Sequence, residues 1–462
     1  MKRLLLAVVV LASAFVLRAA AYEKTWESLD SRPVPAWWQD AKLGIFIHWG
    51  PYSVPAYAPY DKDNIYACYA EWYHGRWLKG HEAFRAHHAK YYGNMPMGNF
   101  AAQFTARHFD PAKWADLFTR AGAKYVVLTS KHHDGYALWP SEQSPYFNSV
   151  ALGSGRDLAG ELTRAMKAAG LKSGFYYSLL EYANPLYPYA KNYGGVTSPN
   201  ADAKTWSRTM NLPQMKELVE KYGADIIWTD GEWDLSDEEL LSKDFLHWLY
   251  NESKMKDTVV VNDRWGKKCR GRHGGHYCTE YGHSEGDAKA KTSAIHPWEE
   301  CRGIGRSFGY NRFETTQQYM SGEELVRLFV RIISGGGNLL LNIGPDAEGL
   351  IPPIMEDRLL QLGGWISANA EAVYASRARA SGVHNIGKSL FFTEKPEALY
   401  AISTVYPKGE IRIPDAAFAK GVTVLGQDVR VDWRLDGDML VLSLPAGAHL
   451  DGQYAWTFRI AK

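Results

Sequence analysis

Acidic, imidazole and guanidinium side chains follow directly after several apolar stretches of this 462-residue chain. The polar residues that follow these stretches are His48, Lys131-His132-His133-Asp134, Tyr177-Ser178, Asp230 and Asn262-Asp263-Arg264. Aromatic rings accompany them, because Trp49, Trp228 and Trp265 lie in the same segments. Sugar rings stack on aromatic faces, and their hydroxyls need charged or imidazole hydrogen-bond partners. This mixture therefore favours a sugar site over a phosphate or acyl site.

Hydrolysis of a glycosidic bond with retention needs two carboxyl groups about 5 to 5.5 Å apart, one attacking and one exchanging protons. Asp230 is the first candidate, because strand alternation puts it on one face with Ile226 and Trp228. The candidates for the second carboxyl group are Glu71, Glu280, Glu285, Glu299 and Glu300, and spacing alone does not choose among them. The sequence contains no phosphate-binding loop, serine nucleophile elbow or HExxH helix.

These residues also have plainer interpretations. Asp230 at a strand end could cap a helix or hold an ion pair, and His48 on an inward face could be a core histidine. Trp72, Trp228 and Phe308 could simply fill the core. Neighbours on a strand point to opposite faces, so we expect His132 and His133 to contact sugar hydroxyls rather than share a metal ion.

The elements that would position these side chains repeat about every fifty residues. Three amphipathic helices, near 111–121, 158–169 and 213–222, each end before a β-branched and aromatic strand, over 124–130, 172–178 and 224–230. Further strands are expected over 43–48, 258–262 and 338–342. Alternating strands and helices indicate a parallel sheet, and the absence of a Gly-rich phosphate turn favours an α/β (β/α)8-like (TIM) barrel over a doubly wound sheet. Ser236 and Glu239 predict a capping-box helix start.

The pattern changes after a helix expected over 355–375. Short alternating segments, such as 399–405, 422–425 and 439–444, are separated by Gly, Pro and Asp turns. They predict a C-terminal antiparallel β-sandwich. We therefore divide the chain into residues 1–21, a catalytic barrel over 22–376 and a sandwich over 377–462.

Residues 1–21 have the pattern of a secretory signal peptide, with Lys2-Arg3, an apolar run over 4–17 and the small residues 19–21. We expect the mature chain to be exported, either periplasmic or secreted; an uncleaved anchor is the alternative. The four cysteines are too few for a disulfide-built scaffold. Cys269, His273, His276 and Cys278 fit no standard zinc spacing, so a Cys269–Cys278 disulfide or free thiols are expected instead.

Charge is balanced, with 52 Lys and Arg against 51 Asp and Glu and a formal net charge of +1. Such a chain has no extended basic field, which argues against binding nucleic acid or an anionic membrane. No segment after the signal peptide is long and uncharged enough to insert in a membrane. Oligomeric state is left open.

Several separated motifs together carry a family resemblance. They are Gly44-Ile-Phe-Ile-His48-Trp-Gly, Glu71-Trp72, Lys131-His132-His133-Asp134-Gly, Trp228-Thr-Asp230-Gly, Asn262-Asp-Arg264-Trp-Gly, Trp298-Glu299 and Ser307-Phe308-Gly-Tyr. In this order they resemble the retaining α-L-fucosidases of glycoside hydrolase family 29. The resemblance implies a (β/α)8-like barrel with a C-terminal β-sandwich, no metal or other cofactor, and double displacement on terminal α-L-fucose of fucosylated glycans.

The resemblance also implies residue roles. Asp230 is the nucleophile that forms the fucosyl-enzyme, and Glu280 of the Glu-Tyr pair is the acid/base, with Glu299 as second choice. The residues that it places around the sugar are His48, Glu71, Trp72, His132, His133, Tyr177, Trp228, Arg264 and Phe308. An apolar wall such as Phe308 would favour the C6 methyl of fucose over a hydroxymethyl by roughly 1 to 3 kcal/mol.

Two other classes of function are weighed against a fucosidase. A catalytically silent fucose- or glycan-binding protein would bind the sugar without turnover. A metal-dependent barrel hydrolase would use His48, His132, His133 and Asp230 and lose activity on chelation, but the chain lacks a His-x-His strand.

Overall fold

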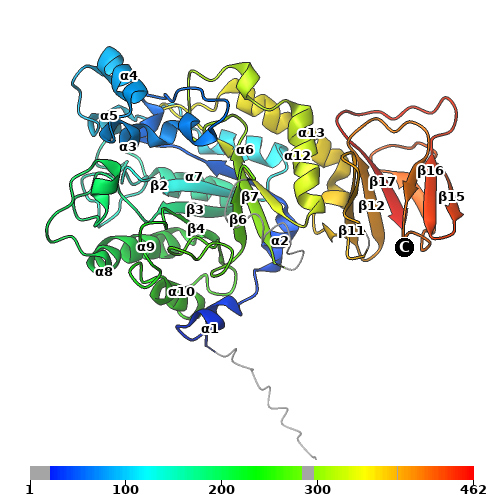
Figure 1. The fold of residues 1–462 in the computed structure, drawn as a ribbon, viewed down its shortest axis with the longest axis horizontal. Coiled ribbons are helices and arrows are strands. Elements are labelled where there is room, and N and C mark those ends of the chain that lie inside the picture. Colours follow the sequence, from blue (N-terminus) through cyan, green and yellow to red (C-terminus); the bar gives the residue numbers. More distant parts are fainter. Residues whose placement is uncertain (1–20, 283–295, 382) are drawn as a thin grey trace, which may run out of the picture.

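An eight-stranded parallel sheet organises the larger, N-terminal part of the chain (Figure 1). The computed structural model describes residues 21–282, 296–381 and 383–462. Residues 1–20 of the expected signal peptide, and Glu285, lie outside the described residues. The eight strands are β1 Leu43–Ile47, β2 Tyr125–Lys131, β3 Lys172–Ser178, β4 Ile226–Asp230, β5 Val260–Val261, β6 Tyr277–Glu280, β7 Trp298–Gly303 and β8 Asn338–Ile343.

The sheet closes into a barrel. Its strand order is β5-β4-β3-β2-β1-β8-β7-β6. The two ends are joined by backbone hydrogen bonds from Gly275 N to Asn262 O, 2.9 Å, and from His276 N to Val261 O, 3.1 Å. The expected (β/α)8-like barrel is therefore confirmed. β6 and β7 are the strands for which the sequence pattern gave no prediction.

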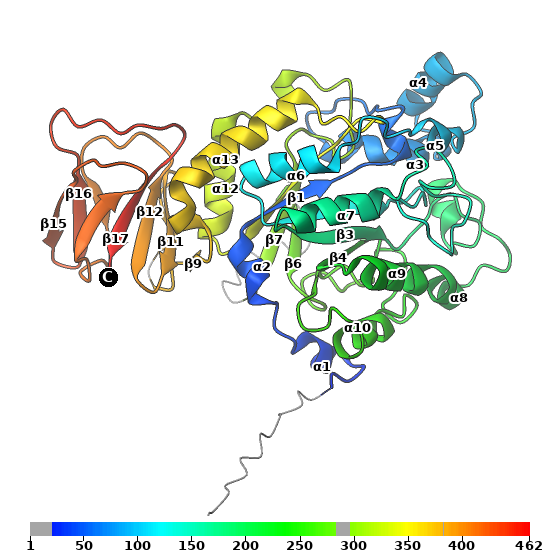
Figure 2. The same ribbon diagram turned by 180° about the vertical axis from the view of Figure 1, so that it is seen from behind.

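Helices surround the sheet, most of them along the outside of the barrel (Figures 1 and 2). They are α1 Trp26–Asp30, α2 Ala36–Ala41, α3 Tyr73–Leu78, α4 Glu82–Tyr92, α5 Asn99–Gln103, α6 Pro111–Arg120, α7 Leu158–Ala168, α8 Ala203–Trp206, α9 Leu212–Tyr222, α10 Ser242–Asn251, α12 Gly322–Ser334 and α13 Pro353–Val373. The capping bonds of Ser236 and Glu239 form, but they close a turn. The helix α10 begins only at Ser242, because Leu241 before it adopts a φ of 54°.

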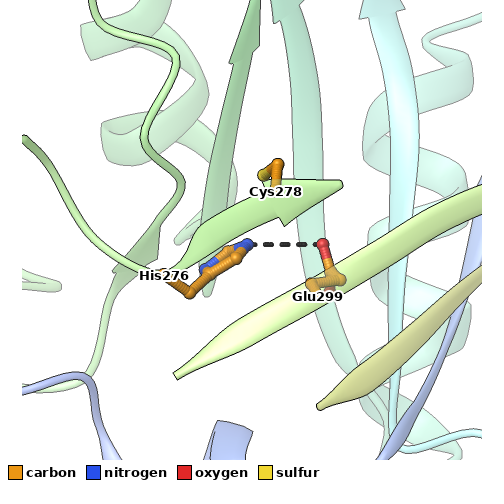
Figure 3. Close-up of side chains that lie close together, drawn as sticks. All are labelled: His276, Cys278 and Glu299. Atoms are coloured by element: carbon orange, nitrogen blue, oxygen red, sulfur yellow. Dashed lines mark ion pairs between the residues drawn. The ribbon is translucent and has the colours of Figure 1, made fainter. Parts of the chain in front are cut away.

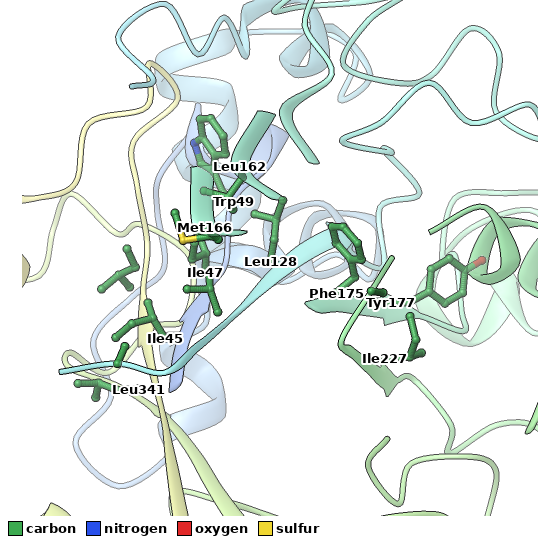
Figure 4. Packing of buried hydrophobic residues seen from close by; sticks show 14 of the residues in the cluster. Ile45, Ile47, Trp49, Leu128, Leu162, Met166, Phe175, Tyr177, Ile227 and Leu341 are labelled. Carbon is green, nitrogen blue, oxygen red and sulfur yellow. The ribbon is translucent and has the colours of Figure 1, made fainter. Parts of the chain in front are cut away.

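Strand alternation separates two apolar layers. Outward-facing residues such as Ile45, Leu128, Phe175 and Ile227 pack together with residues of the surrounding helices (Figure 4). Inward-facing residues form a second cluster, which consists largely of Phe46, Tyr125, Val127, Tyr176, Ile226, Trp228, Cys278, Cys301, Phe308 and Leu340. The barrel interior is thus filled with aromatic side chains, and polar groups collect above them at the carboxyl ends of the strands.

The C-terminal part is an antiparallel sandwich of two sheets (Figure 2). One sheet has the order β10-β11-β12-β17-β14, with β9 beside β11, and the other has the order β13-β16-β15. The strands are β9 Arg377–Ala378, β10 Asn385–Ile386, β11 Leu390–Lys395, β12 Ala398–Ser403, β13 Ile411–Ile413, β14 Gly421–Val424, β15 Asp432–Asp436, β16 Met439–Ser443 and β17 Trp456–Ala461. Phe392, Leu440 and Phe458 pack in their shared core, so the expected sandwich is confirmed.

Two sequence expectations concern cross-links and membranes. All four cysteines are buried and in the thiol form, so of the two expected alternatives the Cys269–Cys278 disulfide does not form and the one without a disulfide holds. Over the described ranges, none of the helices combines the length and apolar character required to cross a bilayer.

Candidate active site

A pocket of about 320 Å³ opens at the carboxyl-terminal end of the barrel strands. Its lining includes ten of the residues predicted from the sequence: His48, Glu71, Trp72, His132, His133, Trp228, Asp230, Arg264, Glu280 and Phe308. This volume is at the lower end of the range for small-molecule sites, which suits a single sugar ring. Two predicted residues, Tyr177 and Glu299, are not in the lining.

Asp230 is the last residue of β4 and faces the pocket. Its Oδ2 accepts a hydrogen bond from Tyr176 Oη at 2.9 Å, and its Oδ1 accepts one from an Arg264 guanidinium nitrogen at 2.5 Å. Two further cationic or imidazole groups lie near, His133 at 3.7 Å and Arg270 at 3.8 Å. Burial would raise the pKa of Asp230, but Arg264, together with these two groups, outweighs it and holds the pKa at about 2. Asp230 is therefore an ionised carboxylate at neutral pH.

Glu280 ends β6 and shares the same guanidinium. The second terminal nitrogen of Arg264 donates to Glu280 Oε2 at 3.2 Å, while Tyr69 Oη donates to Oε1 at 2.7 Å. One buried arginine thus contacts both carboxyl groups. The two carboxyl groups that a retaining glycosidase needs therefore meet at one guanidinium.

Three buried histidines also line the pocket. Burial lowers the pKa of His48 to about 3 and that of His133 to about 4, and lowers that of His132 well below its ordinary value. His48 Nδ1 pairs with Asn342 at 2.7 Å, and His133 Nδ1 pairs with Ser178 at 2.6 Å. Neutral imidazoles can donate and accept, which suits sugar hydroxyls.

The expectation that His132 and His133 point to opposite faces is wrong. Both line the pocket and their ring centroids are 4.2 Å apart, although alternation predicts opposite faces. The reason is that β2 ends at Lys131, after a register irregularity between Thr129 and Lys131. The two imidazoles follow the strand, so its two-residue period does not apply to them.

Glu71 adds a third carboxyl group on another side of the pocket. Its Oε2 accepts a hydrogen bond from Gly309 N at 2.8 Å, and the side chain is almost completely buried. Burial raises the pKa of Glu71 to about 7. Near neutral pH this carboxyl group is therefore partly protonated and can donate as well as accept.

Aromatic rings form the floor and walls. Trp228 lies on the floor with the Arg264 guanidinium 4.5 Å above its ring. Phe308 packs against His48, with ring centroids 4.8 Å apart, and against Tyr69 at 5.2 Å. At the rim, Trp72 stacks on Trp233, with centroids 6.2 Å apart. These faces offer apolar surface to sugar C–H groups and to a methyl substituent.

Glu299 contacts the Trp228 indole from outside the pocket lining and lies beside His276 and Cys278 (Figure 3). It accepts hydrogen bonds from Trp228 Nε1 at 3.0 Å and from Tyr125 Oη at 2.5 Å, and His276 Nε2 lies 3.3 Å away. The side chain is only 1% exposed. Glu299 is therefore placed to hold the indole of Trp228, and Glu280 is the carboxyl group that meets the pocket.

The residues that could share a metal ion differ from those expected from the sequence. Within the described ranges, the His, Cys, Asp and Glu ligand atoms close enough to share an ion belong to His276, Cys278 and Glu299, which lie within 4.8 Å of one another (Figure 3). This is one ligand fewer than the four of a structural zinc site. The group lies under the pocket floor, and the pocket's three histidines and Asp230 are not part of it.

Tyr176, not Tyr177, reaches the pocket. In the register of β3 with β4, Tyr176 pairs with Trp228, so both face inward. Tyr177 points outward into the core beside the helices (Figure 4), where its hydroxyl donates to Gln214 at 2.8 Å. The predicted inward face of Trp228 and Asp230, extended to the neighbouring strand, was the signal that could have found Tyr176.

Other pocket residues carried weaker signals. Tyr69 immediately precedes the Ala-Glu71-Trp72 segment, and Trp233 follows Asp230 by three residues. Arg270 lies in the segment between Cys269 and Cys278, which has no motif to mark it. Its contact with the site depends on how this segment folds back over β4.

A barrel whose strand ends present two carboxyl groups on one arginine, neutral imidazoles and aromatic walls defines a glycoside hydrolase. Comparison with known proteins agrees: residues 9–371 match the family model described as alpha-L-fucosidase. Human tissue alpha-L-fucosidase is 40% identical over 448 residues, covering 95% of this chain and 91% of that protein. An alpha-L-fucosidase of Dictyostelium discoideum is 43% identical over 368 residues, covering 78% of this chain and 76% of that one.

Solved structures show the same relation. The Thermotoga maritima alpha-fucosidase in complex with fucose aligns with a TM-score of 0.81 and 35% identity, covering 95% of this chain and all of that one. Its complex with a mechanism-based inhibitor gives 0.81, 36% identity and 96% coverage of this chain. The chain belongs to the α-L-fucosidase family, glycoside hydrolase family 29.

Proposed function

We propose that this α-L-fucosidase removes terminal α-L-fucose from fucosylated glycans by double displacement, with Asp230 as nucleophile and Glu280 as acid/base. The observation that carries the proposal is the single buried Arg264 that contacts both carboxyl groups. It keeps one of them ionised and places the other beside the reacting centre.

The reaction has two steps, formation and hydrolysis of the fucosyl-enzyme. The Asp230 carboxylate bonds to C1 of fucose while the C1–O bond of the leaving group breaks, and protonated Glu280 gives its proton to that oxygen. Glu280, now a carboxylate, takes a proton from water, the water oxygen bonds to C1, and the bond to Asp230 breaks. Asp230 suits the first step because its pKa of about 2 keeps it ionised.

The remaining pocket residues support sugar binding. The neutral imidazoles of His48, His132 and His133 and the carboxyl group of Glu71 face the pocket and can hydrogen-bond hydroxyls. Phe308, Trp72 and Trp228 offer apolar faces, and Phe308 is the wall that we assign to the C6 methyl. Selectivity for fucose then comes from apolar fit.

The test is hydrolysis of a chromogenic α-L-fucoside by the parent chain, with and without chelator, beside Asp230→Ala and Glu280→Ala. We expect chelator-resistant release and near-complete loss in the Asp230 variant. The Glu280 variant should lose most on substrates with poor leaving groups, because good ones need no protonation. Parent-like activity of Asp230→Ala would refute the mechanism, and binding of fucose without turnover by the parent chain would indicate a silent glycan-binding protein.

We also propose that the chain is exported after removal of residues 1–21. The support is the basic start, the apolar run and the small residues before position 22. Expression of the full chain with N-terminal sequencing of the mature product tests this. A product that begins at Tyr22 is expected, and an intact N-terminus in the cell fraction would contradict it.

A further inference from the structure

A second recess adjoins the sugar pocket and is lined mainly by cations. Its volume is about 690 Å³, and its lining residues are Glu232, Trp233, Gly266, Lys267, Lys268, Arg270 and Arg272. Trp233 and Arg270 belong to both cavities, so the recess continues from the pocket rim. We call the site formed by these residues the basic recess.

Carboxylates of the described residues neutralise little of this positive charge. Arg270 is paired, because its Nε donates to Glu232 Oε1 at 2.6 Å, and this uses the one carboxylate among the described lining residues. Lys267, Lys268 and Arg272 are exposed, and none forms an ion pair with a carboxylate of the described residues. The whole chain has a net charge of only +1, so the accumulation of cations is local.

The segment that carries these cations is held in place. Lys267 N donates to Leu235 O at 2.8 Å, and Arg272 N donates to Cys269 O at 2.9 Å. Gly271 N donates to Asp263 Oδ2 at 2.8 Å, and Cys269 is buried. The backbone therefore presents the side chains at a fixed place beside the pocket, which lowers the entropic cost of using them for binding.

The boundary between the two cavities suits a second sugar. Trp233 is 36% exposed and stands at this boundary, stacked on Trp72. An exposed indole is a surface on which a hexose ring can stack. Arg270, which lines the basic recess, lies 3.8 Å from Asp230. Only this side chain separates a group bound in the recess from the reacting centre.

We propose that the basic recess is the leaving-group subsite for glycans whose second sugar carries an anionic group, a sulfate ester or a carboxylate. Lys267, Lys268 and Arg272 provide the charge, and Trp233 supports the ring. The inference rests on the proposed fucosidase function and names its substrate class. An exposed ion pair is weak alone, but several acting on one anion add up and also steer its approach.

The experiment compares three forms of one α-L-fucosyl disaccharide that the parent chain hydrolyses. C6 of the second sugar carries a hydroxyl, a sulfate ester or a carboxylate. We expect kcat/KM to be about tenfold higher for the anionic forms at low salt, as a few exposed ion pairs imply. This preference should shrink in 0.5 M NaCl, where screening acts within about 4 Å. The two anionic forms show whether sulfate or carboxylate is preferred.

The test variant is Lys267→Gln, Lys268→Gln and Arg272→Gln combined. It should lose most of the anionic preference and keep parent-like activity on the neutral disaccharide and on a neutral chromogenic fucoside, since none of the three lines the sugar pocket.

The matched control combines Lys388→Gln, Lys408→Gln and Lys420→Gln. These three lysines are exposed on the C-terminal sandwich, so their replacement changes the net charge equally far from the site. The control should keep the full preference.

The outcomes separate the two levels of inference. No hydrolysis of any fucoside by the parent chain overturns the proposed function and, with it, this inference. Hydrolysis with equal kcat/KM for the three disaccharides overturns the inference alone. So does an anionic preference that survives in the test variant or disappears equally in the sandwich control.

Discussion

Removal of one hydroxyl from β3 tests which face of the strand serves catalysis. Tyr176 and Tyr177 are neighbours, and both are almost completely buried. The Tyr176 hydroxyl donates to Asp230 Oδ2 at 2.9 Å, whereas the Tyr177 hydroxyl donates to Gln214 and accepts from Lys131 at 3.0 Å. Tyr176→Phe and Tyr177→Phe therefore delete the same atom from opposite faces of one strand.

A hydrogen bond to a charged group contributes about 1.5 to 3 kcal/mol, so its complete loss from the variant's transition state would lower the rate about ten- to a hundredfold. The bond is also present in the free enzyme, where Asp230 is fully charged, so this range is an upper bound for the variant. We therefore expect Tyr176→Phe to lower kcat/KM about tenfold, because Asp230 Oδ2 loses the donor that orients it. Tyr177→Phe should keep parent-like kcat/KM and lose about 1 to 3 kcal/mol of stability, since Lys131 and Gln214 lose a buried partner.

The assay is hydrolysis of a chromogenic α-L-fucoside at 25 °C and neutral pH, with unfolding followed by circular dichroism to show that both variants are folded. Equal losses of kcat/KM in the two variants would refute the assignment of faces. Full activity of Tyr176→Phe would refute the claim that this hydroxyl orients the nucleophile.

Two further predictions concern other carboxyl groups. Burial raises the pKa of Glu71 from 4.5 to about 7. The neutral carboxyl group therefore stabilises the folded state fully below pH 4.5, and this contribution of about 3 kcal/mol is lost as the pH rises from 4.5 through 7. Glu71→Gln should therefore gain stability relative to the parent chain between pH 4 and 8, measured as unfolding midpoints; a constant difference would contradict this. Glu299→Gln should cost about 1 to 3 kcal/mol of stability, because Trp228 and Tyr125 donate to different carboxylate oxygens and the NH2 that replaces one of them cannot accept, yet it should keep most activity. A loss of kcat/KM as large as that of Glu280→Ala would instead make Glu299 the acid/base.

Much of the architecture could be predicted from the sequence, because long apolar strands and amphipathic helices carry strong periodic signals. The strands around Phe46, Val127, Phe175 and Ile227 were predicted within a few residues. The strands β6 and β7 were not, since they are rich in polar and charged residues such as Glu280. Their pairing is set by the neighbouring strands rather than by local preference.

Within the site, the sequence by itself determined the residues that follow directly from strand ends or named motifs. Asp230 and Trp228 had to share a face, because alternation is fixed by backbone geometry. Spacing did not show which carboxyl group meets Asp230, and the family resemblance placed Glu280 before Glu299; the tertiary structure separates the two. Glu280 and Glu299 lie on adjacent barrel strands, but one opens to the pocket and the other holds the indole from below.

The physical reason is the range over which each interaction acts. The spacing of apolar residues in a helix or a strand is a local property, so it can be read from a few consecutive residues. The contact of Arg264 with both carboxyl groups, and the arrival of Arg270 beside Asp230, depend on segments that meet only when the barrel closes. No local pattern encodes those distances.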